Sequence, residues 1–188
     1  MSSKREQLIE TAARLFAKNG FHATGIDMIL AEAGIAKKTL YNHFRTKDEL
    51  ILAALRKHDG EFRNNFMKSV EELAETPEAR LLAIFDVAKI WFSDNNFYGC
   101  MFINAVGEYS EQDSAVREVC KEFKRLMRGY IKSLAEQAGI KEVEDLTSEL
   151  ALLLEGSIVT AQVSELNDKA ADTAKRIART LIENAKQK

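Results

Sequence analysis

The stretch Thr24–Leu50 constrains the fold more than any other part of this sequence, because two short helical patterns meet there at a glycine. Apolar residues recur at helical spacing between residues 25 and 33 and predict a first helix, with the hydroxyl of Thr24 capping its free amides. Gly34 falls where a left-handed residue closes a helix, and the two residues after it complete a short turn. This pattern predicts a helix-turn-helix.

The second helix of the pattern, from about residue 37 to residue 44, has one apolar face and one polar face. Leu40 and Phe44 share the apolar face, so both must be buried. The other positions are Lys37, Lys38, Thr39, Tyr41, Asn42 and His43. Lysine and tyrosine commonly bind DNA phosphates, whereas asparagine and threonine match base edges. Because a helix this short is unstable alone, we expect a recognition helix that its neighbours hold against double-stranded DNA.

Two flanking positions extend the predicted DNA-binding surface. Thr46 and Glu49 have the spacing of a capping box, which starts the next helix and places Lys47 in its first turn. A lysine there can reach a phosphate at the helix end. We therefore expect DNA contacts from Thr24, Lys37, Lys38, Thr39, Tyr41, Asn42, His43 and Lys47.

This segment resembles the DNA-binding part of the tetracycline-repressor (TetR) family of bacterial transcription regulators. The resemblance rests on Gly34, Ile35, Lys37, Thr39, Leu40, Tyr41, His43, Phe44, Lys47, Glu49 and Leu50, and upstream on Ile9, Ala12, Leu15, Phe16, Gly20, Phe21, Thr24 and Ile29. One departure is Ala36, where the family commonly has a serine or threonine that caps the recognition helix. Because losing such a cap costs about 1 kcal/mol, we expect the start of this helix to be frayed in the free protein and ordered on DNA.

The charge of the chain is unevenly distributed. The formal net charge is −2, yet residues 1–60 hold ten Lys or Arg against seven Asp or Glu, a surplus of +3 that leaves −5 for the remainder. All three histidines also lie in that first part. A modestly basic head on an acidic body would orient the chain at DNA and keep its non-specific affinity low.

The sequence carries no pattern typical of a secreted, membrane, metal-binding or catalytic protein. No signal-type segment begins the chain and no stretch reaches the roughly 18 apolar residues of a membrane span, so we expect a cytoplasmic protein without membrane contact. Cys100 and Cys120 form no C-x-x-C pair and no cluster with the histidines, so no metal site is predicted. Since phosphate-loop and nucleophile motifs are also missing, we expect neither an enzyme nor a cofactor.

The remaining chain predicts further helices and an all-α fold, in keeping with a single proline and 30% charged residues. Predicted helices span about residues 3–18, 25–33, 37–44, 46–75, 101–109, 114–138, 144–166 and 168–186, with another beginning at Thr76-Pro77. We expect an N-terminal three-helix helix-turn-helix domain, residues 1–48, and a C-terminal helical-bundle domain for ligand binding and dimerisation, residues 49–188. Residues 47–75 form the linking helix. Its apolar pattern is interrupted at residues 57–60, so a bend or a change of packing partner is expected there.

The last two predicted helices carry more apolar surface than one chain can cover. The run ALLLEGSIVTAQV, residues 151–163, is apolar on nearly all sides, and such a helix needs a partner beyond its own domain. The TetR resemblance implies that these helices pair with their copies in a second subunit as a four-helix bundle. A two-fold homodimer also suits paired recognition helices on pseudo-palindromic half-sites.

Aromatic and methionine side chains gather in the middle of the body, where they form either an ordinary helical core or the wall of a ligand pocket. Candidates for binding a largely apolar small molecule are Phe85, Trp91, Phe92, Tyr98, Cys100, Phe102, Asn104, Phe123, Met127, Glu155 and Gln162. Glu155 lies on an otherwise apolar helix, so its carboxylate requires a polar partner or a polar groove at the dimer seam.

These patterns together predict a ligand-responsive transcription regulator, a repressor that binds its operator as a homodimer and is released when a small molecule tilts the linking helix. One alternative is a thiol-based redox or electrophile sensor, because Cys100 follows a glycine at a predicted helix N-terminus, where a thiolate is favoured. The same thiol could equally be a small buried hydrophobe. A helical enzyme or interaction module is the other alternative, but no set of nucleophile, base and orienting group supports an enzyme.

Overall fold

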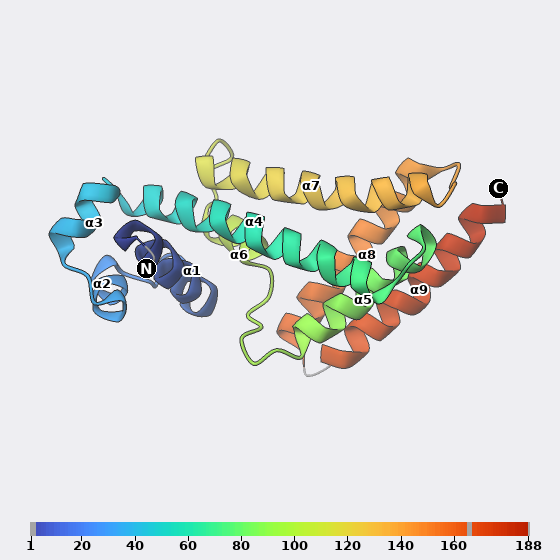
Figure 1. The fold of residues 1–188 in the computed structure, drawn as a ribbon, viewed down its shortest axis with the longest axis horizontal. Coiled ribbons are helices and arrows are strands. Elements are labelled where there is room, and N and C mark those ends of the chain that lie inside the picture. The colour runs from blue at the N-terminus through green and yellow to red at the C-terminus, as the bar shows by residue number, and fades with distance from the viewer. Residues whose placement is uncertain (1–2, 165–166, 188) are drawn as a thin grey trace. The chain divides into compact units, whose positions relative to one another are not determined.

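The protein is all-helical in a computed structural model that describes residues 3–164 and 167–187 (Figure 1). Across these residues the helices are α1 (Lys4–Asn19), α2 (Ile26–Ala33), α3 (Lys37–His43), α4 (Lys47–Leu73), α5 (Pro77–Phe92), α6 (Met101–Glu108), α7 (Ala115–Gln137), α8 (Val143–Val163) and α9 (Asn167–Gln187), and no strand occurs. The predicted all-α fold is confirmed. Predicted helix ends lie within two residues of the observed ones, except Leu166, which lies outside the described residues.

Two glycines end the first two helices. Gly20 (φ 87°) follows α1 and Gly34 (φ 62°) follows α2, and each donates its backbone N–H to the preceding helix. Only glycine adopts a positive φ without steric cost. The tight turn between α2 and α3 is therefore encoded locally, as the sequence predicted.

Threonine hydroxyls start two later helices. Thr76 accepts the N–H of Ala79 ahead of α5, which has its proline in the first turn. Thr46 accepts the N–H of Glu49 at 3.2 Å, which confirms half of the predicted capping box at the start of α4. The other half differs, because the carboxylate of Glu49 accepts the N–H of Arg45 at 2.7 Å.

The chain divides into two compact units. The first contains the residues up to Phe62 together with Cys100–Phe123, and the second contains Arg63–Gly99 and the residues from Lys124 onward. Helix α4 runs unbroken through residues 57–60, and it passes from the first unit to the second just beyond them. The predicted domain boundary between residues 48 and 49 stays a prediction.

Within the first unit, α1 packs against both α2 and α3. The side chains of Leu8, Phe21, Ile29 and Leu40 are fully buried there, and the rings of Phe16 and Phe21 stack with their centroids 5.1 Å apart. Burying each such side chain contributes about 1.5–3 kcal/mol. This packing, rather than helix propensity, holds the seven-residue α3 in place.

Within the second unit, α5, α8 and α9 pack together. Ion pairs between described residues of α5 and α9 join Lys175 to Asp86 at 2.7 Å, Lys89 to Asp172 at 2.7 Å, and Lys186 to Glu78 at 2.6 Å. Partly exposed pairs of this kind contribute at most about 1 kcal/mol each. They define how α5 and α9 align, while buried apolar side chains supply most of the stability.

One helix among the described residues, α8, is long and apolar enough to cross a membrane by length and composition alone, with a mean hydropathy of 1.2. The sequence prediction did not anticipate this, because serine, threonine and glutamine interrupt the apolar run. Helices in protein cores pass the same test, and 39% of this segment is buried. Since α8 packs against α5 and α9, we describe it as a packing helix of the second unit.

Candidate nucleic-acid interface

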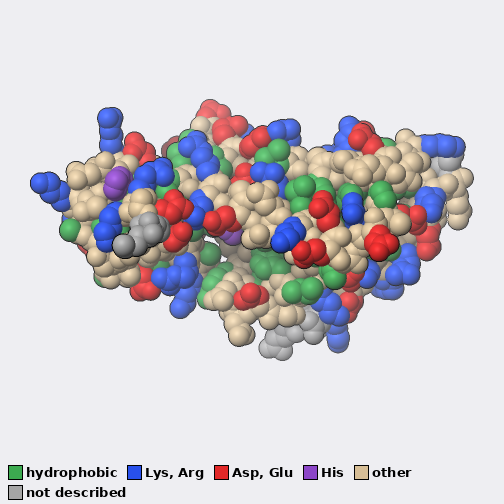
Figure 2. Space-filling view, viewed as in Figure 1, with side chains coloured by type: hydrophobic (Ala, Val, Ile, Leu, Met, Phe, Trp, Pro, Cys, Tyr) green, Lys and Arg blue, Asp and Glu red, His purple; other side chains and the backbone are tan. Residues whose placement is uncertain are grey.

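Helix α3 presents a polar face beside its buried one. Leu40 and Phe44 are 0% and 3% exposed, which confirms the two predicted faces. Thr39 is half-exposed, and the exposed side chains are Lys37, Lys38, Tyr41, Asn42 and His43. Figure 2 shows Lys and Arg side chains standing clear of the surface over this part of the chain. Cations, an amide and an exposed aromatic hydroxyl on one short helix match the donors and acceptors of duplex DNA.

The first turn of α3 lacks a side-chain cap. Ala36 occupies the N-cap position and accepts the N–H of Thr39 and of Leu40 through its carbonyl oxygen only, at 2.9 and 3.3 Å. The predicted loss of a cap is therefore confirmed. Fraying of this turn in the free protein stays a prediction.

Two lysines flank the polar face. Lys37 lies 3.2 Å from Asp27, but both side chains are largely exposed, so the pair contributes at most about 1 kcal/mol and a phosphate can replace Asp27. Lys47, in the first turn of α4, donates to the carbonyl oxygen of His22 at 3.4 Å. An ammonium group has three donors, so Lys47 retains donors for a phosphate while the contact keeps it beside the turn between α1 and α2.

The structure places Thr24 differently from its prediction. Its side chain is fully buried, and its hydroxyl points at the carbonyl oxygens of Gly20 (2.7 Å) and Leu15 (3.2 Å). Helix α2 begins after Gly25 with no side-chain cap. The predictions that Thr24 caps α2 and offers its side chain to DNA are therefore wrong. Its hydroxyl instead donates to carbonyl oxygens in the last part of α1 and just after it, because burial requires a polar group to find a partner.

Sequence reasoning did not predict the contact that Glu108, the last residue of α6, makes with this region. Its carboxylate accepts the backbone N–H of Phe21 at 2.8 Å and of His22 at 2.6 Å, in the turn between α1 and α2. The imidazole Nε2 of His22 lies 2.9 Å from the carbonyl oxygen of Glu108. A side chain on Gly20 would meet this carboxylate at 2.9 Å. Partners 86 and 87 residues apart leave no local signal, so only the fold reveals this contact.

The end of α6 is held from several directions. The ring of Tyr109 stacks on His22, with centroids 5.2 Å apart, and its hydroxyl donates to Asp48 of α4 at 3.4 Å. Burial, and then the charge of Asp48, raises the pKa of Tyr109 to about 12, so the phenol keeps its proton at neutral pH. Arg117 of α7 donates to the carbonyl oxygens of Val106 and Tyr109 at 3.3 and 3.1 Å. Helices α6 and α7 thus anchor the turn between α1 and α2, which precedes the helix-turn-helix.

Two family models match this sequence. Residues 8–54 match the bacterial regulatory proteins of the tetR family, and residues 77–181 match the tetracyclin repressor-like C-terminal domain. The chain belongs to the TetR family of transcriptional regulators. It is therefore a DNA-binding regulator and not an enzyme, and its exposed α3 is the second helix of the helix-turn-helix that the family shares.

Relatives and solved structures agree with this assignment. YerO, an uncharacterized HTH-type transcriptional regulator of Bacillus subtilis, is 42% identical over 82 residues, which are 44% of this chain and 28% of YerO. The fatty acid metabolism regulator protein of the same organism is 22% identical over 169 residues, 90% of this chain and 87% of that protein. The crystal structure of SCO4454, a TetR-family transcriptional regulator from Streptomyces coelicolor, superposes with a TM-score of 0.89 at 26% identity and covers 97% of this chain and 95% of that one.

Four of the predicted ligand-contacting residues of this TetR-family regulator lie in the first unit: Cys100, Phe102, Asn104 and Phe123. The rings of Phe102 and Phe123 stack, with centroids 3.8 Å apart. The imidazole of His58 lies 5.6 Å from the ring of Phe62 and 5.7 Å from that of Phe102, so α4, α6 and α7 share one aromatic cluster. Burial lowers the pKa of His58, with nearby carboxylates opposing the shift, and the ring is therefore neutral at pH 7.

The other predicted ligand-contacting residues lie in the second unit: Phe85, Trp91, Phe92, Tyr98, Met127, Glu155 and Gln162. Trp91, Phe92 and Phe97 form a separate three-ring cluster with centroid distances of 5.1 to 5.7 Å. Glu155 has the partner that its position requires, because Lys124 of α7 lies 3.2 Å away. Gln162 lies so close to Gly99 that a side chain there would meet its Oε1 at 2.0 Å.

Both cysteines are buried. Cys100 is 4% exposed and Cys120 is 2% exposed. Cys100 is the N-cap residue of α6, as its position after a glycine suggested, but it makes no side-chain cap hydrogen bond. A buried thiol is shielded from oxidants and electrophiles, so the redox-sensor alternative is not favoured. No group of three His, Cys, Asp or Glu side chains that could hold a metal occurs in the described residues.

Helices α8 and α9 leave large apolar side chains in solvent. Leu152 is 74% exposed, Val163 is 76% exposed, Val159 is 40% exposed and Ile177 is 38% exposed. A groove of about 300 Å³ runs between the two helices and is lined mainly by small residues and apolar stems. Contiguous exposed apolar surface of this kind marks a place where another surface binds.

Proposed function

We propose that this TetR-family regulator is a repressor that binds a pseudo-palindromic operator as a homodimer and leaves it when a small molecule binds. The observation that carries the proposal is α3, which buries Leu40 and exposes cations, one amide and an aromatic hydroxyl. Lys37, Lys38, Tyr41, His43 and Lys47 are assigned to phosphates, and Thr39 and Asn42 to base edges. Regulators of this family bind operator DNA, which supports the assignment.

The homodimer is proposed to form through α8 and α9. Exposed Leu152 and Val163 would be covered by the same helices of a second copy, and the small residues of the groove allow close approach. Burying one such side chain contributes about 1.5–3 kcal/mol, and a two-fold interface counts each contact twice. A dimer also places two recognition helices on half-sites about 34–36 Å apart.

The effector is proposed to be a largely apolar small molecule. Each unit offers its own candidate contacts: Phe102 and Phe123 with Asn104 in the first unit, and Trp91 and Phe92 with Glu155 and Gln162 in the second. A relative that matches nearly the whole chain is named a fatty acid metabolism regulator, which supports testing apolar compounds first. A regulator of this kind would act in the cytoplasm, where the DNA is.

Release is proposed to be a population shift. An effector that binds more tightly to a conformation with a tilted α4 would shift the population of the dimer toward that conformation. The size of the shift is set by the difference in the affinity of the effector for the two conformations. Because the recognition helices must match the spacing of two half-sites, a small displacement would break phosphate contacts at both ends. Loss of several charge contacts weakens binding by orders of magnitude at physiological salt.

Selection of genomic fragments by the purified protein at physiological salt, followed by sequencing, tests this function. Enrichment of one short pseudo-palindrome is the expected result, and the gene beside it would narrow the class of effector. If nothing is enriched, the protein should be unfolded, extracted for mass spectrometry, refolded and tested again. Failure of the refolded, extracted protein to enrich any sequence would overturn the proposal.

A further inference from the structure

A cleft of about 510 Å³ lies in the first unit between α1, the end of α3 and the first half of α4. Its floor is apolar, because Ile9 and Phe44 are each 3% exposed there and Leu52 is half-buried. Charged side chains form its rim. Apart from His43, the last residue of α3, none of them belongs to the DNA-contacting set predicted above.

The acidic groups of this cleft are already engaged. Glu6 is ion-paired with Lys57, which also lies 2.8 Å from Glu61 and 3.4 Å from Glu10. These carboxylates raise the pKa of Lys57 and keep its ammonium occupied. Glu49 accepts a backbone N–H ahead of α4 at 2.7 Å. In the described residues, neither Glu6 nor Glu49 forms an ion pair with an arginine of the cleft.

Two arginines of the cleft are uncommitted. In the part of the chain that the structure describes, neither Arg5 nor Arg56 has an ion pair or a side-chain hydrogen bond. The guanidinium of Arg5 lies 5.3 Å from the centre of the Phe44 ring. This cation–π contact holds the group in place but leaves the N–H donors at its edge free.

We propose that this cleft binds an oxyanion, a phosphate or carboxylate group, through Arg5 and Arg56. Guanidinium groups match such anions with paired N–H donors, and a guanidinium fixed in advance on an aromatic ring loses little entropy when it binds. His43 lines the cleft and also ends the recognition helix. An anion held here therefore lies beside the proposed DNA-binding face.

The anion can come from two sources. One is the DNA backbone flanking the half-site, and this source rests on the proposed function of the chain. The other is a free anionic metabolite, which would bind whether or not the protein contacts DNA. Both sources present the same kind of oxyanion to the cleft. Only a contact with the DNA backbone contributes to the salt dependence of DNA binding.

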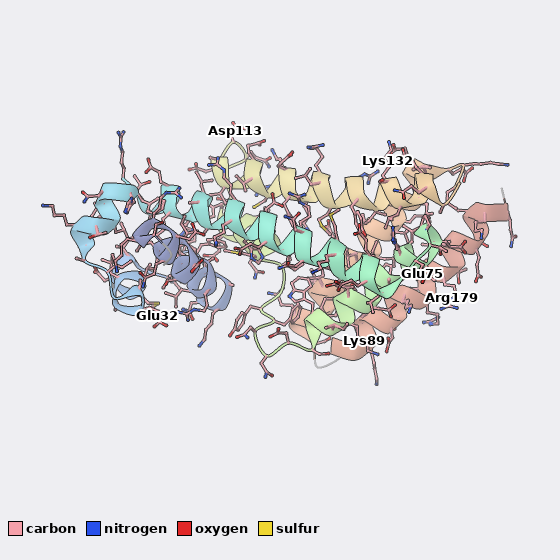
Figure 3. The ribbon with its side chains drawn as sticks, in the orientation of Figure 1. Glu32, Glu75, Lys89, Asp113, Lys132 and Arg179 are labelled. Atoms are coloured by element: carbon pink, nitrogen blue, oxygen red, sulfur yellow. The ribbon has the colours of Figure 1, made fainter. Side chains whose placement is uncertain are left out.

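The test compares the wild-type protein, Arg5→Gln, Arg56→Gln, the double variant and Arg179→Gln. Arg179, labelled in Figure 3, is an exposed arginine of α9 in the second unit and serves as a control with the same change of charge as each single variant. Binding to a mixed-sequence 30-base-pair duplex is titrated between about 50 and 200 mM KCl, a range in which backbone contacts dominate. In parallel, melting temperatures are measured with inorganic phosphate replacing chloride at constant ionic strength.

If the cleft binds backbone phosphates, the double variant reduces the slope of log K against log salt by about 0.9 for each lost phosphate contact, and the control does not. If the cleft takes a free anion, inorganic phosphate raises the melting temperature of the wild type and of the control but not of the double variant, and the slope is unchanged. Either result supports the proposal. Agreement of the double variant with the control in both assays would overturn it. Failure of the wild type to bind the duplex at low salt would count against the proposed function alone, since the phosphate assay needs no DNA.

Discussion

The contact of Glu108 with the turn between α1 and α2 predicts a measurable loss of local stability when its carboxylate is removed. In Glu108→Ala the N–H of Phe21, whose hydrogen bond is partly buried, loses its acceptor, and an unsatisfied buried amide costs about 1–3 kcal/mol. The N–H of His22 is exposed, so water replaces the carboxylate at a cost below about 1 kcal/mol. The free energy for opening the turn should therefore be lower by about 1–4 kcal/mol than in the wild type.

Amide hydrogen exchange measures this directly, because the exchange rate of a protected amide reports its local opening free energy. A loss of about 2 kcal/mol corresponds to exchange about 30-fold faster at Phe21 and His22. Glu108→Gln keeps one carbonyl oxygen and should give a smaller effect. Glu111→Gln, an exposed acid just beyond α6, is the matched control and should leave both amides unchanged.

The reasoning would be refuted if these two amides exchanged at the same rate in Glu108→Ala and Glu111→Gln. A uniform increase across all of the first unit would also contradict it, since that result would mean global destabilisation. Exchange in α8, which lies in the second unit, provides the internal reference.

Further predictions concern the interface, the dimer and pH. Tyr41→Ala and Lys47→Ala should weaken binding to operator and non-operator duplexes alike, and gel shifts unchanged for both duplexes would exclude the phosphate roles. Asn42→Ala should relax base preference at one operator position by about 1–3 kcal/mol, and an unaltered preference in a site selection would exclude direct contact. Leu152→Asp should weaken dimerisation by at least about 1.5–3 kcal/mol, the contribution of one buried leucine, and so shift the protein toward monomer in sedimentation. An equally stable dimer would show that the interface lies elsewhere. Because burial holds the pKa of His58 below 6.5, the free energy of unfolding should fall as pH drops through about 6.5. This fall should be less steep in His58→Phe, and identical pH profiles of the two proteins in denaturation would contradict the prediction.

The helices and the recognition face were predictable because their signals are local. Gly34 requires the left-handed backbone that only glycine adopts cheaply, and Thr46 and Thr76 offer hydroxyls where helices begin. The two faces of α3 followed from the positions of Leu40 and Phe44 alone. Features of this kind depend on residues within one or two helical turns of each other, so a short stretch of sequence is enough to predict them.

The contacts between distant segments could not be predicted. Thr24 had the identity and position of a helix cap, yet its hydroxyl turned back to α1 because the turn buries it. Only the packing of α6 against the turn brings two backbone N–H groups to the carboxylate of Glu108, and no local pattern predicts this contact. The sequence pattern placed the aromatic residues in the middle of the body, but their division into one cluster in each unit depends on tertiary packing.

The turn between α1 and α2 is linked to the rest of the chain in two ways that predict different responses to an effector. Helix α4 is joined to this turn through α2 and α3 and by the hydrogen bond from Lys47 to His22, so a tilt of α4 would move the turn with it. Glu108 holds the turn by hydrogen bonds whose loss costs about 1–4 kcal/mol, and an effector needs only that difference in affinity to release it. If tilting of α4 governs release, the Glu108→Ala protein should still dissociate from DNA when effector is added. If the Glu108 contact governs release, the variant should bind DNA weakly without effector, and adding effector should weaken it little further.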